Sequence, residues 1–215
     1  MSFRGGFVVI ETIENDSDEL VRRAAAGDRR AEQTLYGQHR QRLKRMICVR
    51  IDQRVAGRVD PSDIVQETLA EAARQLPDYA RQRPLPLYPW LRQLALSKVR
   101  EAYRRHVQAA GRSVQREADI PLPDHSAMDL ARCLASSRSG PSRRLLRGEQ
   151  RQLVRQTLER LGEAAREVLV LRFLEQMSVA ETAAVLGLSE SGVRSRQRRA
   201  LEQFCRLFEE IGDAR

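Results

Sequence analysis

The residues of this chain best suited to contact another molecule lie near its C-terminus, where serines and arginines cluster behind a glycine. An arginine guanidinium offers paired N–H donors that fit both phosphate and the major-groove edge of guanine. Such side chains read duplex DNA when one helix presents them together to the major groove. The residues that we assign to duplex contact are Ser189, Ser191, Arg194, Ser195, Arg196, Arg198 and Arg199.

The residues around this cluster predict a helix-turn-helix. A first helix is expected over 179–186, Gly187 suits the left-handed residue that ends a helix, and Ser189 suits the N-cap of the next one. Plain helical packing with solvated arginines is the alternative, but the turn, the cap and the basic face together favour DNA contact. Apolar residues at helical spacing are expected to face the core, namely Val193, Ala200, Leu201, Phe204 and Phe208.

A second candidate surface, between residues 60 and 78, is acidic. It would repel phosphate, and its mixed polar and apolar face suits a protein partner. The alternative is that acids in a first turn simply offset the helix dipole. The residues alone leave these two interpretations equally balanced. Those that we assign to a protein partner are Asp60, Asp63, Ile64, Gln66 and Glu67.

A third candidate surface combines aromatic residues with a run of basic ones. Basic side chains can track a nucleic-acid backbone while aromatic rings stack on unpaired bases. We expect Tyr79, in a proline-rich loop over 79–89, to stack on a base, and Trp90 to lie in the core. The basic residues assigned to a single strand are Arg92, Lys98, Arg100, Arg104 and Arg105.

Composition bounds the function. The formal net charge of +9 over 215 residues indicates a polyanionic partner. Cys48, Cys133 and Cys205 are far apart and form no metal-ligand spacing with the histidines, so we expect no metal, cofactor or disulfide. No phosphate-binding loop or catalytic triad is recognisable, which argues against an enzyme. Neither a signal peptide nor a membrane span is indicated, and we expect a cytoplasmic protein.

The periodicity predicts an all-α protein of two helical domains joined by a flexible linker. The expected parts are an arm (1–16), a first domain (17–110), the linker (111–147) and a four-helix domain containing the helix-turn-helix (148–211). Pro77 is expected to end the third helix of the first domain. The helices expected are 17–27, 28 to the low fifties, 61–76 and 90–108, then 148–161, 163–174, 178–186 and 189–210.

Taken in order, these surfaces resemble the extracytoplasmic-function (ECF) family of RNA polymerase sigma factors. Three stretches carry the resemblance: DPSDIVQETLAEA (60–72), YPWLRQLALSKVREAYRR (88–105) and the 151–204 block ending GLSESGVRSRQRRAL. The resemblance covers about residues 17–110, which would be sigma region 2, and 147–210, which would be region 4.

The resemblance implies roles that composition does not show. Residues 60–72 would grip a coiled coil of core RNA polymerase, and 79–105 would open and read the −10 promoter element as a melted strand. Ser97 stands where the family often has asparagine, so we add it to that site. Arg194, Ser195, Arg198 and Arg199 would meet the −35 element in duplex DNA. An anti-sigma factor that masks the docking helix is a further partner to expect in this class.

Two rival functions remain to be weighed. A stand-alone helix-turn-helix regulator would explain the C-terminal residues but leave the acidic segment 60–72 without a partner. A serine recombinase would need a catalytic serine on a stranded fold, and the sequence shows no alternating strand pattern of useful length. A promoter-specificity factor without catalysis of its own is the favoured prediction.

Overall fold

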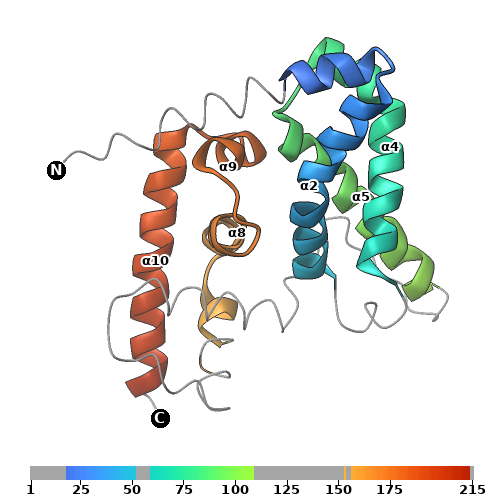
Figure 1. Ribbon diagram of the computed structural model, residues 1–215. Coiled ribbons are helices and arrows are strands. Elements are labelled where there is room, and N and C mark those ends of the chain that lie inside the picture. Colours follow the sequence, from blue (N-terminus) through green and yellow to red (C-terminus); the bar gives the residue numbers. More distant parts are fainter. Residues whose placement is uncertain (1–17, 52–58, 109–152, 154–155, 214–215) are drawn as a thin grey trace.

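The computed structural model describes residues 18–51, 59–108, 153 and 156–213. Every regular element in those ranges is a helix, which confirms the predicted all-α class (Figure 1). The predicted arm (1–16) and linker (111–147) lie outside the described residues.

The N-terminal region packs a short helix over 18–25 with three long helices. Two of the long helices begin where the sequence predicts. Asp28 caps the first of them by accepting hydrogen bonds from the backbone N–H groups of Arg30 and Ala31. Asp60 caps the second through Ser62 N–H, with Pro61 in its first turn. The long helices are α2 (Arg29–Arg50), α4 (Pro61–Gln82) and α5 (Leu87–Gln108).

The prediction that a helix ends before Pro77 is wrong. Helix α4 passes through Pro77 and ends at Gln82, and the backbone of its C-cap residue Arg83 is left-handed. The proline ring points to solvent, while Leu76 and Tyr79 on either side of it are buried in the core. Their burial offsets the hydrogen bond that the proline cannot donate. The expected loop over 79–89 shrinks to 83–86, because α5 begins at Leu87.

The C-terminal region confirms the predicted helices that fall on described residues. Within the predicted helix 163–174, the last turn widens to a π-helix, so the element divides in two. Of the predicted helix 148–161, the structure describes Leu153 and 156–160 as helical. The remaining helices are α8 (Glu163–Leu169), η2 (Val170–Leu174), α9 (Val179–Leu186) and α10 (Glu190–Asp213).

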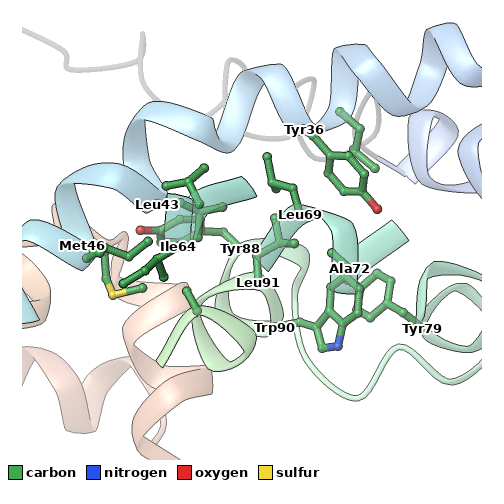
Figure 2. Close-up of a cluster of buried hydrophobic side chains, with 14 of the residues drawn as sticks. Tyr36, Leu43, Met46, Ile64, Leu69, Ala72, Tyr79, Tyr88, Trp90 and Leu91 are labelled. Carbon is green, nitrogen blue, oxygen red and sulfur yellow. The ribbon is translucent and has the colours of Figure 1, made fainter. Parts of the chain in front are cut away.

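Two clusters of buried side chains form the core, and each contains residues from both regions. Leu35, Leu43 and Ile47 are fully buried in the N-terminal cluster, part of which Figure 2 shows. Leu171 and Met177 of the C-terminal region belong to that same cluster, while Val49 of α2 packs into the C-terminal cluster. The two regions are therefore packed directly against each other.

Candidate nucleic-acid interface

The first helix of the helix-turn-helix, α9, is fixed at both ends by local bonds. Ser178 and Glu181 form a reciprocal capping box, with Glu181 N–H donating to Ser178 Oγ at 3.0 Å and Ser178 N–H donating to Glu181 Oε2 at 2.7 Å. Gly187 ends the helix at φ +62°, in the left-handed region, as predicted. Ser189 Oγ then accepts from Gly192 N–H at 3.1 Å, which confirms its predicted capping role.

Helix α10 has one buried, apolar face and one exposed, polar face. Val193, Ala200 and Phe204 are buried, as predicted, and fix the rotation of the helix against the core. Exposed residues on its other side and at its N-terminus are Ser189, Ser191, Arg194, Ser195, Arg198 and Arg199, while Arg196 is half-buried. The ion pairs made by Arg194 and Arg198, with Glu190 at 2.7 Å and Glu202 at 3.9 Å, are exposed. Such pairs contribute little and leave the guanidinium groups accessible.

Sequence reasoning missed Arg172, which links η2 to α10. Its Nε donates to Gln197 Oε1 at 3.1 Å, and its guanidinium also donates to the carbonyl of Met177, just before α9. Burial lowers the pKa of Arg172, with the nearby charge of Arg194 acting in the same direction. The Arg172 side chain thus bonds both to the segment that precedes α9 and to a side chain of α10. Its partner Gln197 lies 25 residues away, so no local signal could have identified it.

The acidic segment presents four of its five assigned residues on the surface. Asp60, Asp63, Gln66 and Glu67 are exposed. Ile64 is only 2% exposed, because its side chain faces the N-terminal core; its assignment to a partner-binding surface is therefore corrected. This turn of α4 binds the core through its apolar residues and offers its polar ones to solvent.

The basic residues of α5 adjoin this acidic surface. Ser97, Arg100, Arg104 and Arg105 are exposed, and Lys98 is half-buried beside Glu101, at 3.2 Å. Arg105 lies 3.5 Å from Glu67 of α4. The basic surface and the acidic surface therefore meet along the line where α4 and α5 pack.

Tyr79 does not lie in a loop, and its assignment to base stacking is corrected. It belongs to α4, is 5% exposed, and stacks on Trp90 with ring centroids 4.2 Å apart (Figure 2). Its hydroxyl donates to the carbonyl of Leu85 at 3.0 Å, and burial raises the pKa of Tyr79 to about 12. Trp90 is buried, as predicted. Both rings are core residues that join α4 to α5.

Arg92 is likewise removed from the predicted DNA-facing surface. It is 5% exposed, and its guanidinium donates to both oxygens of Glu175, at 2.5 and 3.1 Å. Arg50 of α2 donates to the same carboxylate at 2.8 Å and to Glu167 at 2.7 and 3.0 Å. Burial alone would raise the pKa of Glu175, but the charges of Arg92 and Arg50 outweigh it and hold that pKa below its usual range.

A second contact between the regions lies at the start of α9. Arg42 of α2 donates to both oxygens of Glu181, at 2.9 and 3.0 Å. The same guanidinium lies 3.6 Å above the ring of Tyr88, a favourable cation–π arrangement, and the ring of His39 also stacks with Tyr88. Glu181 therefore serves both the capping box of α9 and the contact with α2.

Helix hydropathy and the placement of potential metal ligands among the described residues bear on other classes of protein. No described helix combines the length and apolar character needed to cross a membrane. No group of three or more histidine, cysteine, aspartate or glutamate side chains is arranged there to hold a metal ion.

The chain is similar to known proteins of one family. Residues 151–204 match the family model described as sigma-70, region 4. The ECF RNA polymerase sigma factor SigD of Mycobacterium tuberculosis is 31% identical over 194 residues, covering 90% of this chain and 83% of SigD. RNA polymerase sigma factor CnrH of Cupriavidus metallidurans is 31% identical over 198 residues, covering 90% of this chain and 95% of CnrH.

A solved structure agrees with these sequence matches. CnrH, in complex with the cytosolic domain of CnrY, superposes with a TM-score of 0.52 and 26% identity, covering 91% of this chain and 98% of CnrH. The matches include the N-terminal region as well as the helix-turn-helix, which decides against a stand-alone regulator. Proteins of this kind direct transcription initiation with RNA polymerase and are not themselves enzymes. The chain belongs to the ECF family of RNA polymerase sigma factors.

Proposed function

We propose that this sigma factor docks on core RNA polymerase through the exposed polar face of α4, and reads promoter DNA with α5 and α10. The −35 element would be bound as a duplex by α10, and the −10 element as a melted strand by α5. The observation that carries this assignment is the division of α10 into a buried face around Val193 and an exposed face rich in arginine.

The polymerase-docking surface consists of Asp60, Asp63, Gln66 and Glu67. The exposed position of these residues supports the assignment, because a partner can reach all four without disturbing the core. Hydrogen bonding to Ser62 lowers the pKa of Asp60 below its ordinary value, so this carboxylate is charged at neutral pH. The surface is suited to a basic patch on the polymerase.

The −10 site consists of the exposed or half-exposed polar residues of α5. Arg100, Arg104 and Arg105 would hold the strand backbone, with Ser97 and Lys98 nearer the bases. The 3.5 Å approach of Arg105 to Glu67 supports placing this site beside the proposed docking surface. Polymerase and melted DNA would thus contact adjacent helices of one rigid unit.

Two substitutions test the division of roles. Arg198→Ala should weaken binding to a −35 duplex about 10-fold while leaving co-elution with core polymerase unchanged, because a good contact to a base pair contributes ~1–3 kcal/mol. Glu67→Lys should do the reverse. Arg206→Ala, exposed farther along α10, is the matched control and should change neither. If Arg198→Ala lost polymerase binding, or Glu67→Lys retained it, the assignment would be wrong.

Regulation by a protein inhibitor is part of the proposal. CnrH, whose fold this chain shares, was solved with the cytosolic domain of CnrY. We infer that an anti-sigma factor also acts on this chain, in the cytoplasm where transcription occurs. Co-elution of the purified sigma factor with a candidate inhibitor, in competition with core polymerase, tests this partner.

A further inference from the structure

The contact between the N-terminal and C-terminal regions, here called the seam, has positive side chains on one side and negative side chains on the other. Every charged side chain that α2 and α5 contribute to the ion pairs across it is an arginine, and every charged partner from the C-terminal region is a glutamate, among the described residues. The contacts also include Arg45 of α2, which donates to the Gln176 side chain. The arginines are Arg42, Arg50 and Arg92, and the glutamates are Glu167, Glu175 and Glu181.

The centre of this seam is sealed from water. The side chain of Glu175 is 0% exposed, and those of Arg50 and Arg92 are 8% and 6% exposed. Gln176 follows at φ +54°, a left-handed conformation that is uncommon for a residue other than glycine. This turn lets Glu175 and Met177 both enter the N-terminal region, where Met177 joins the hydrophobic cluster. The contacts of Glu175 and Met177 with the N-terminal region thus hold Gln176 in its left-handed conformation.

We propose that this contact is a latch: Glu175, gripped by Arg50 and Arg92, holds the free sigma factor closed, and the latch must open before both promoter elements can be bound. The proposal rests on the function proposed above. Separation exposes all three charged groups to water at once, so opening trades a buried ion network for hydration. Such a network favours one defined arrangement of the regions without making it irreversible.

Geometry requires the opening. The −10 and −35 elements are separated by about 25 base pairs, which at about 3.4 Å each is roughly 85 Å of DNA. A compact chain of 215 residues has a radius of gyration of ~17 Å, hence a diameter of ~45 Å. Two regions in direct contact through Arg92 and Glu175 cannot place α5 and α10 on both elements. The chain between residues 108 and 153 can span the difference, because an extended residue covers ~3.5 Å.

The closed form leaves each DNA surface exposed by itself, but it cannot place both on one promoter. The arginines of α10 are exposed while Glu175 is engaged, so a duplex carrying only the −35 element should bind equally well to the closed and open forms. DNA that carries both elements should bind as a unit only after opening. This difference separates an effect on the latch from an effect on the reading helix.

The first experiment removes the charge at the centre of the latch. Glu175→Gln keeps the shape of the side chain but removes the buried anion, which leaves Arg50 and Arg92 with only the partly exposed Glu167 as a shared anion. Small-angle scattering of the full-length free protein should show a larger radius of gyration, and apparent affinity for DNA that carries both elements should rise about 10-fold as the open fraction grows. Glu209→Gln, exposed on α10, is the matched control and should stay compact.

A second variant guards against a folding defect in the first. Glu181→Gln weakens the pair with Arg42 but can retain the capping box, since glutamine also caps. It should open the protein partially with unchanged helix content by circular dichroism. If both variants keep native helix content and remain as compact as the wild type, the latch does not exist.

A reversible lock tests whether opening is required. In a background with Cys48, Cys133 and Cys205 replaced by serine, Arg45→Cys and Gln176→Cys can be joined by a cleavable bismaleimide. The locked holoenzyme should lose transcription from a promoter with both elements, regain it on cleavage, and keep −35 duplex binding throughout. Full activity of the locked protein would overturn the latch. Loss of −35 binding by every variant, with compaction behaving as expected, would instead contradict the function proposed for α10.

Discussion

Tyr79 of α4 and Trp90 of α5 stack with ring centroids 4.2 Å apart and an interplanar angle of 19°. Because both rings are buried, this pair fixes the packing of α4 against α5. The position of the proposed docking surface relative to the proposed −10 site therefore depends on an aromatic contact in the core, and not on the loop that joins the two helices.

Substitutions at Tyr79 should change stability and leave DNA contact unaffected. Tyr79→Ala should lower the free energy of unfolding by ~3–5 kcal/mol, as large aromatic truncations do. Tyr79→Phe keeps the stack and loses only the bond to Leu85, at a cost of ~1 kcal/mol. Urea denaturation measures both. Tyr79→Phe should bind single-stranded −10 DNA like the wild type, and a loss of 10-fold or more would restore a direct role for the hydroxyl.

Two glycine substitutions should act in opposite directions. Gly187→Ala places a side chain at φ +62° and should destabilise the C-terminal region by ~1 kcal/mol. Gly37→Ala, inside α2 with open space around the added methyl group, should stabilise by ~0.5–1 kcal/mol. Thermal unfolding of the two variants beside the wild type checks the signs. Stabilisation by Gly187→Ala would mean that the turn is not left-handed in solution.

His39 should make the protein sensitive to mild acid. Burial lowers the pKa of His39 to about 4, and the charge of Arg42 acts in the same direction. In the unfolded chain His39 binds a proton near pH 6.5, whereas in the folded protein it stays neutral down to about pH 4. The free energy of unfolding should therefore decrease as pH falls from 6.5 towards 4. Paired carboxylates such as Glu175, with lowered pKa values, lose their contribution only below about pH 4.5.

His39→Phe isolates this effect. The ring can still stack on Tyr88, and the two buried ring nitrogens, which have no hydrogen-bond partner, are removed. The free energy of unfolding, measured by urea denaturation at several pH values between 7 and 5, should depend less on pH for this variant than for the wild type. An unchanged slope over that range would assign the acid sensitivity to another group.

Local signals account for what the sequence predicted correctly. Gly187, Ser189 and Asp60 act on their own helix ends, so their types and positions were sufficient to place the turn and the caps. Helical spacing placed Val193, Ala200 and Phe204 in the core for the same reason. Nothing beyond a few neighbouring residues was needed for these predictions.

Long-range packing decided where sequence reasoning failed. Arg92 resembles its exposed neighbours along the chain, but its partner Glu175 lies 83 residues away on another region. Pro77 carries a strong helix-ending signal that is overridden by the burial of Tyr79 against Trp90. Both errors moved core or seam residues onto the predicted DNA surface, since charge and aromaticity have the same appearance in sequence whether buried or exposed.

A substitution at Ser189 can separate its capping role from its proposed contact with DNA. Ser189→Asp preserves the N-cap, and an acid at the start of a helix is favourable, so stability should be unchanged or slightly increased. The added negative charge would face the phosphate backbone, and affinity for the −35 duplex should fall at least 10-fold, more steeply at low salt. Fluorescence anisotropy at two salt concentrations measures this.

Ser62→Asp supplies the matched control for that experiment. It makes the same chemical change in the first turn of α4, on the opposite region, and should leave −35 binding within about twofold of the wild type because exposed charges are screened beyond ~10 Å. If Ser62→Asp weakened the duplex as much as Ser189→Asp, net charge alone would explain the loss. If Ser189→Asp bound as tightly as the wild type, the N-terminus of α10 would not enter the groove, and the reading face would have to lie farther along the helix.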